Sequence, residues 1–198
     1  MITQLIEWDK ELFLQIHLGM ASPYMDSFML LIREAKTWIP LYLFFAFLAV
    51  RKYKLNGLYF ILIAAIVVVL TDRFSAGFMK PFFERLRPCH NPIFLTEGFI
   101  RNILNCGGQY GFVSSHAANH FGLAVIFSWF FKQITDYKFI DSIFYLWAGL
   151  ISFAQIYVGK HYPADVLVGA FSGIVIGFLI LKLYIRLMPL DKKITKTY

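Results

Sequence analysis

Long runs of apolar residues separated by short polar segments dominate the chain. A bilayer's hydrocarbon core requires about 20 residues of helix, so we predict about five membrane-spanning helices. They cover residues 24–50, 58–79, 116–131, 139–158 and 163–188. The third run is short, and we expect it to recruit residues at both of its ends. The pattern predicts an all-α, multi-pass membrane helix bundle.

The N-terminal residues 2–18 follow a different pattern, with charges placed between apolar positions. The apolar positions recur at roughly helical spacing and are Ile2, Leu5, Ile6, Leu12, Phe13 and Ile16. This periodicity favours an amphipathic helix in the membrane interface, and a helix packed on the bundle is the alternative. Charges at positions 7–11 interrupt the apolar stretch that a signal peptide needs, so we expect the first long run to direct insertion.

Composition strengthens the membrane assignment. The 198 residues are 59% hydrophobic, with a mean hydropathy of +0.61, whereas soluble domains contain about 45–50% apolar residues. The length suits one domain, residues 1–198. The net charge is +7, but the basic residues cluster between apolar runs, which indicates membrane topology and no nucleic-acid partner.

The basic residues predict which side of the cell membrane each loop faces. One side collects Arg51, Lys52, Lys54, Lys132, Lys138, Lys182, Arg186, Lys192, Lys193 and Lys196. By the positive-inside rule this side is cytoplasmic. The N-terminal segment, the loop 80–115 and the turn 159–162 then lie on the extracytoplasmic side.

Both cysteines, Cys89 and Cys106, belong to the loop 80–115. Disulfides persist outside the cytoplasm, so we predict a bond between them, with two free thiols as the alternative. A loop of roughly 15–20 residues closed in this way is worth about 3 kcal/mol.

The last apolar run contains overlapping GxxxG steps at Gly169, Gly173 and Gly177. Small residues at this spacing let helices approach closely. We favour packing within the bundle over a dimer interface, and the oligomeric state stays open.

Polar residues gather at the predicted extracytoplasmic ends of three helices, in residues 80–88, 111–116 and 157–165. Ionisable residues near membrane spans are costly and tend to be functional. Each cluster also has a structural interpretation. The cations could reach out to the interface, Ser114 could cap a helix, and His161 and Asp165 could form a structural pair.

Taken together, the clusters indicate phosphate chemistry. Lys80, Arg85 and Arg87 can neutralise a phosphate. A helix that opens at Ser114 and Ser115 can offer backbone amides to an anion. A histidine supported by a carboxylate is a usable nucleophile, and a second histidine can protonate a leaving alkoxide.

The ordered clusters resemble the type 2 phosphatidic acid phosphatase family, which is related to the vanadium haloperoxidases. Its KXXXXXXRP pattern is matched by Lys80 and Arg87-Pro88. Its PSGH pattern is matched in part, by Ser114 and His116, with Val113 and Ser115 in place of Pro and Gly. Its SRXXXXXHXXXD pattern is matched by His161 and Asp165, with Ala154 and Gln155 at the Ser-Arg positions.

The resemblance implies a role for each matched residue. His161 attacks phosphorus, Asp165 orients it, and His116 protonates the leaving group. Lys80, Arg87 and Ser114 hold the phosphate, and Ser115 offers its amide. The family needs no metal and no other cofactor. A separate metal pair formed by His116 and His120 lacks its further ligands, so we expect no metal site.

Gln155 is the departure with the largest consequence, because the family arginine at this position braces the phosphate. Losing one charge-assisted hydrogen bond costs about 1.5–3 kcal/mol. Arg73 precedes Lys80 by about two helical turns, which would place both on one helix face. We hypothesise that Arg73 or Arg85 replaces the missing guanidinium, and an altered enzyme is the alternative.

These residues predict a membrane phosphatase that acts on a lipid phosphate at the extracytoplasmic face through a phosphohistidine. Candidate substrates are undecaprenyl diphosphate, phosphatidylglycerol phosphate, phosphatidic acid and the 1-phosphate of lipid A. The alternatives are a non-catalytic phospholipid-binding or transport protein and a vanadate-dependent peroxidase. Several membrane spans argue against the peroxidase.

Overall fold

The computed structural model describes residues 1–187, apart from the side chain of Ile2. Met188, Lys192, Lys193 and Lys196, which belong to the sequence predictions, lie outside the described residues. Every regular element over that range is helical.

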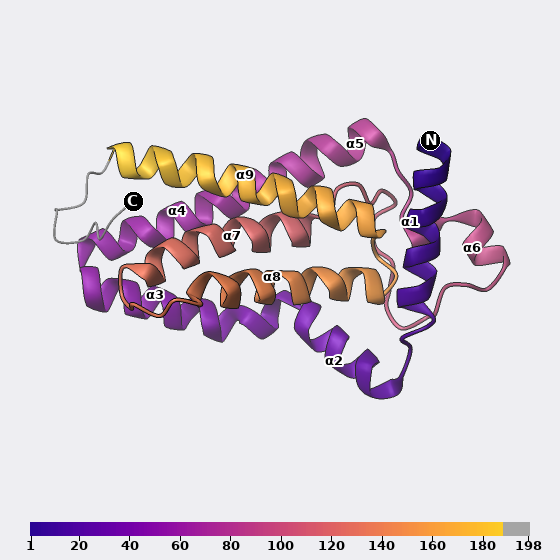
Figure 1. Ribbon diagram of the computed structural model, residues 1–198, viewed down its shortest axis with the longest axis horizontal. Helices are drawn as coiled ribbons and strands as arrows, with labels where there is room; N and C mark the ends of the chain where they lie inside the picture. The colour runs from indigo at the N-terminus through magenta and orange to yellow at the C-terminus, as the bar shows by residue number, and fades with distance from the viewer. Residues whose placement is uncertain (188–198) are drawn as a thin grey trace.

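Five long helices run side by side along the length of the molecule (Figure 1). They are α3 (Ile39–Tyr53), α4 (Leu55–Asp72), α7 (Ser115–Lys132), α8 (Ile140–Tyr157) and α9 (Pro163–Leu187). Helix α7 lies in the middle and packs against α9, α8 and α4. Its low amphipathicity therefore has a physical reason, since a helix surrounded by others buries its side chains on all sides.

Within residues 1–187, three helices are long and apolar enough to cross a membrane: the continuous segment Leu55–Phe83, then Ile140–Tyr157 and Pro163–Leu187. Helix α3 has 15 residues and α7 begins with polar residues, yet both lie alongside these three. Exposed leucines and phenylalanines cover the outside of the bundle, as a lipid-facing surface requires. The predicted all-α membrane bundle is confirmed.

The first apolar run is not one helix, which corrects the prediction for residues 24–50. It forms α2 (Pro23–Arg33), a short 3-10 helix (Ala35–Trp38) and α3. The side chains of Thr37 and Trp38 donate hydrogen bonds to the carbonyl groups of Leu31 and Ile32, at 2.7 Å each. These bonds satisfy carbonyl groups that helix α2 leaves without a partner where it ends.

The segment Leu55–Phe83 contains a π-helix, Arg73–Met79, before the short helix α5 (Lys80–Phe83). Hydrogen bonds of the i→i+5 type widen a helical turn. The spacing between Arg73 and Lys80 therefore does not bring them to one face. Arg73 is exposed, whereas Lys80 is half-buried and turned toward α7.

Helix α1 (Ile2–His17) crosses one end of the bundle (Figure 1). Phe13 and His17 are fully buried, while Leu5 and Trp8 are exposed. The Nδ1–H of His17 donates to the carbonyl of Tyr157 at 2.7 Å, so α1 is both amphipathic and packed on the bundle. We call this end, which also carries residues 84–114, the loop end.

Residues 84–114 are tied together at the loop end by a disulfide and by backbone pairing. Cys89 and Cys106 form the predicted bond. The backbone amide of Arg87 donates to the carbonyl of Gln109 at 3.1 Å, and that of Gly111 donates to the carbonyl of Arg85 at 2.8 Å. These contacts fix the backbone from which both arginines project.

The glycines of α9 face α7. A Cβ atom added at Gly173 would lie 2.1 Å from the carbonyl oxygen of Ala118, and one at Gly169 would lie 2.6 Å from that of Ser114. The GxxxG steps therefore serve packing within the bundle, and they bring the start of α7 against the start of α9.

Candidate active site

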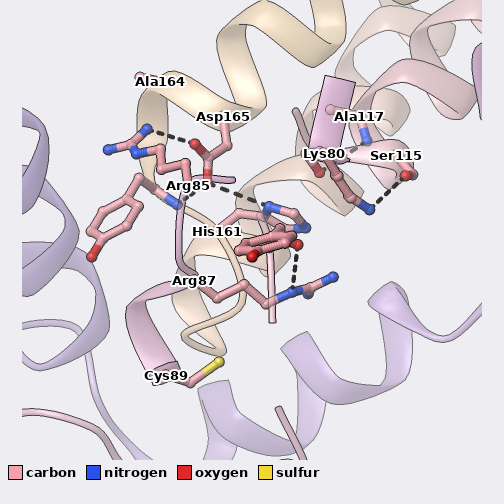
Figure 2. A network of polar contacts seen from close by, with 12 residues as sticks. Lys80, Arg85, Arg87, Cys89, Ser115, Ala117, His161, Ala164 and Asp165 are labelled. Atoms are coloured by element: carbon pink, nitrogen blue, oxygen red, sulfur yellow. Dashed lines mark hydrogen bonds and ion pairs between the residues drawn. The ribbon is translucent and has the colours of Figure 1, made fainter. Parts of the chain in front are cut away.

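The side chains predicted to act on phosphate meet at the loop end, where α5, α7 and α9 converge (Figure 1, Figure 2). His161 lies in the turn between α8 and α9, and Asp165 lies in the first turn of α9. Both side chains are buried. The Nδ1 of His161 is 3.5 Å from Oδ2 of Asp165, an ion-pair distance, and makes no hydrogen bond within the described chain. Because Nδ1 faces the carboxylate of Asp165, Nε2 is the ring nitrogen on the side away from it.

Burial determines the charge of His161. It lowers the pKa of His161 to about 4, against the opposing effect of Asp165. The imidazole is consequently neutral near pH 7 and retains the lone pair that a nucleophile needs.

The Asp165 carboxylate is held by two hydrogen bonds (Figure 2). Its Oδ1 accepts a hydrogen bond from Nη1 of Arg85 at 2.6 Å, and its Oδ2 accepts one from the amide of Tyr162 at 3.0 Å. The guanidinium of Arg85 also lies 4.2 Å from the centroid of the Tyr162 ring. The orientation of Asp165 is therefore fixed independently of His161.

Arg85 is also bound to α1, which the sequence did not reveal. Its Nη2 pairs with Oδ2 of Asp9 at 2.5 Å, and Oδ1 of Asp9 accepts the amide of Ala164 at 2.8 Å. Burial lowers the pKa of Arg85, but Asp165 and Asp9 outweigh this effect and raise it. With two carboxylates as partners, Arg85 supports Asp165 and is not free to replace the family arginine.

The start of α7 faces Lys80. The Nζ of Lys80 donates to Oγ of Ser115 at 2.9 Å, and the Oγ of Ser75 donates to the same atom at 2.8 Å. Ser114 is the N-cap of α7, and its amide donates to the carbonyl of Asp165 at 2.9 Å. Its side chain serves the cap, while Lys80 and Ser115 carry groups that can reach an anion.

Arg87 extends below His161 in Figure 2. Its Nε donates to the carbonyl of Tyr110 at 3.2 Å, and its side chain has no other polar partner in residues 1–187. Burial lowers the pKa of Arg87, and Asp165 opposes that change. The terminal nitrogens of this guanidinium are thus available to an anion.

His116 lies in the first turn of α7 and its ring stacks on His120, with 6.3 Å between centroids. His120 is engaged on both nitrogens: Nδ1 donates to the carbonyl of His116 at 2.8 Å, and Nε2 accepts from the hydroxyl of Tyr42 at 3.2 Å. The ring nitrogens of His116 make no hydrogen bond to the part of the chain that is described. His116 is therefore the histidine left to exchange a proton with a ligand.

Two predicted residues are placed differently from the rest. Gln155 is buried, and its Nε2 has no hydrogen-bond partner among the described residues. Arg73 is exposed on the π-helix and makes no polar contact over the same range. The structure does not bring Arg73 into the site.

The arrangement combines a neutral imidazole backed by a carboxylate, cations from two segments and a second histidine. No group of three or more potential metal ligands occurs in the chain through Leu187. Such a set can hold a tetrahedral anion, attack it with a nitrogen atom and supply a proton to a departing oxygen.

Known proteins share this chain's sequence and fold. Residues 56–189 match the family model described as the PAP2 superfamily. The chain is 31% identical over 183 residues to the lipid A 4'-phosphatase of Porphyromonas gingivalis, covering 91% of this chain and 75% of the relative. It is also 31% identical to the lipid A 4'-phosphatase of Bacteroides thetaiotaomicron over 180 residues, covering 87% of this chain and 75% of that protein.

Two crystal structures have the same fold. Aquifex aeolicus LpxE superposes with a TM-score of 0.61 at 26% identity, covering 87% of this chain and 93% of LpxE. The PAP2-type phosphatidylglycerolphosphate phosphatase of Bacillus subtilis superposes with a TM-score of 0.69 at 20% identity. In that pair the match covers 98% of this chain and 90% of the other chain.

Proposed function

Since this chain belongs to the PAP2 superfamily and is a membrane lipid phosphatase, we propose that it removes a phosphate from a lipid A-type glycolipid at the extracytoplasmic face. The reaction proceeds through a phosphohistidine on His161. The observation that carries this proposal is the buried, neutral His161, backed by Asp165 and adjacent to cations that have no carboxylate partner.

The proposed reaction has two steps. The Nε2 of His161 attacks phosphorus, and the bond between phosphorus and the lipid oxygen breaks. His116, in its protonated form, gives its proton to that oxygen, while Lys80 and Arg87 balance the charge on the phosphoryl oxygens. Asp165 stabilises the ring while it is charged.

A water molecule then completes the cycle. His116 takes a proton from this water as its oxygen attacks the phosphorus of the phosphohistidine. The bond between phosphorus and nitrogen breaks, inorganic phosphate departs and His161 returns to its neutral form. Each residue ends in the state in which it began.

Two findings support the substrate and the membrane face. Both curated relatives carry the name lipid A 4'-phosphatase, which favours lipid A among the lipid classes considered from the sequence. Arg51, Lys52 and Lys132 lie at the last turns of α3 and α7, opposite the loop end. The positive-inside rule favours the cytoplasm for that opposite end.

Phosphate release from a lipid panel tests the proposal. Purified protein is incubated with lipid A, phosphatidic acid, phosphatidylglycerol phosphate and undecaprenyl diphosphate, each with and without a chelator. We expect the fastest release from lipid A, no effect of the chelator, and no release by His161→Ala.

Three results would contradict the proposal. Full activity in His161→Ala would rule out a phosphohistidine on His161. Loss of activity with chelator would rule out the metal-free mechanism. Faster release from another lipid on the panel would reject the lipid A substrate.

A further inference from the structure

Arg33 is the last residue of α2, a helix outside the family motifs, and its Nε atom is buried. Helix α2 packs on α8, and Met29 and Ile32 share a buried cluster with Ala154 and Tyr157 of α8. Residues four apart lie on one face of a helix. Arg33 therefore continues the face that Met29 presses against α8.

Aromatic contacts tie the end of α2 to the turn of α7 that carries His116. The Nε1 of Trp38 donates to the carbonyl of Ile32 at 2.7 Å, and the Trp38 and Trp147 rings lie 5.6 Å apart. Trp147 in turn lies 5.1 Å from His120, which stacks on His116. This series of contacts joins the end of α2, where Arg33 lies, to the turn that carries His116.

The charge of Arg33 affects the pKa values of two cations at the loop end, Lys160 and Arg87. Burial is the main cause that lowers the pKa of Lys160 to about 8, and the charges of Arg33 and Arg87 lower it further. Burial also lowers the pKa of Arg87, and Arg33 adds to that effect against Asp165. The positive charges of Arg33, Arg87 and Lys160 therefore oppose one another.

No carboxylate forms an ion pair with Arg33, Arg87 or Lys160 in the described part of the chain, although Asp165 and Glu34 act on Arg87 and Arg33 from a longer distance. Nε of Arg33 is buried without a hydrogen-bond partner. Asp9 and Asp165 pair with Arg85, and Asp26 pairs with Arg101. The exposed Glu34 forms no ion pair with its neighbour Arg33. A half-buried guanidinium whose buried Nε has no partner is costly, so a bound anion would lower that cost.

We propose that Arg33 is a phosphate-binding residue. It supplies the guanidinium that is missing because Gln155 stands at the position of the family arginine. The proposal deepens the function proposed above and rests on it. A guanidinium can bind two phosphoryl oxygens at once through parallel N–H groups. Arg73 is exposed and Arg85 is paired, whereas Arg33 is half-buried, forms no ion pair among the described residues and has a buried Nε without a partner.

The test compares Arg33→Ala, Arg33→Gln and Arg33→Lys with Lys36→Ala. Lys36 is an exposed cation on the 3-10 helix after α2, so its removal changes net charge equally without touching the site. We expect kcat/KM to fall about 10- to 100-fold in Arg33→Ala and Arg33→Gln, less in Arg33→Lys, and not in Lys36→Ala. The inhibition constant for inorganic phosphate should rise in the first two variants.

A second measurement separates binding from folding and from turnover. Protection by inorganic phosphate against thermal unfolding should weaken in Arg33→Gln and persist in Lys36→Ala. The inference is overturned if Arg33→Gln retains both the phosphate inhibition constant and the protection of the unmodified protein. Should the unmodified protein release no phosphate from any lipid while Arg33→Gln still loses protection, the proposed function fails and the anion site stands.

Discussion

At the scale of the residue, His161 controls the acid side of the pH profile. Protonation removes its lone pair, so activity requires a pH above its pKa. Because burial lowers this pKa to about 4, the neutral form persists well below the ordinary value of about 6.5. We expect kcat/KM to stay high at pH 5 and to decline only as the pH approaches 4.

The measurement is the acid limb of kcat/KM in detergent, corrected for the phosphate of the substrate, whose second pKa is about 6. An acid limb centred near 6.5 after that correction would show that His161 titrates as an exposed histidine does. Buffers are matched in ionic strength, because the site is cationic and its affinity for an anion depends on salt.

The ordered motifs predicted side chains that the structure brings together, but Arg73 was also predicted for the site and does not reach it. Lys80, Arg87, His161 and Asp165 lie close together at the loop end (Figure 2), because each is in or beside a segment that joins two helices there. The spacing of these residues within the motifs reflects where they lie in the fold. The positive charge of an arginine does not show which anion it contacts. Arg85 was therefore considered for the phosphate, although it binds two carboxylates.

Asp9 illustrates a different limit. Its two contacts, with Arg85 and Ala164, join residues that are distant in the sequence. Nothing local distinguishes it from the other charges of an amphipathic helix. Only the docking of α1 across the bundle gives this carboxylate its partners.

At the scale of the element, the contact between α7 and α9 depends on glycine. Gly173→Ala would place a Cβ atom 2.1 Å from the carbonyl oxygen of Ala118, which is backbone and cannot turn away. Gly149→Ala is the matched control, because nothing lies within 4 Å of its added Cβ on α8. We expect Gly173→Ala to lose thermal stability and activity.

The control should unfold at the temperature of the unmodified protein or above it, since alanine favours a helix by about 1 kcal/mol over glycine. The unfolding temperatures of the two variants are measured in detergent by circular dichroism. Equal unfolding temperatures for the two variants would mean that α7 and α9 do not pack as closely as described.

Helix boundaries were predictable where the sequence carries a strong local signal. The stretches Ile140–Tyr157 and Pro163–Leu187 are close to the predicted runs, because each is a continuous apolar segment and the second begins with proline. The break after Arg33 was not predictable from apolar pattern. It depends on Thr37 and Trp38 folding back onto carbonyl groups of α2.

At the scale of the whole molecule, the two ends should be accessible from opposite sides of the membrane. Glu97→Cys adds an exposed thiol at the loop end, and Lys138→Cys adds one between α7 and α8. The two native cysteines do not interfere, since they are joined to each other. We expect a membrane-impermeant thiol reagent to label Glu97→Cys in intact cells and Lys138→Cys only after lysis.

Labelling of Lys138→Cys in intact cells, with Glu97→Cys protected, would reverse the topology and place the site in the cytoplasm. Labelling of both variants after lysis is the control for exposure. This outcome would overturn the proposed membrane face while leaving the phosphatase chemistry unchanged.

The attachment of Asp9 to the start of α9 has a consequence for biogenesis. Asp9 leaves the ribosome 155 residues before its hydrogen-bond partner Ala164. At about 5–20 residues per second, the interval is roughly 10–30 s. The support behind His161 therefore cannot assemble until the start of α9 has been synthesised, so a nascent chain that ends before α9 lacks a complete catalytic site.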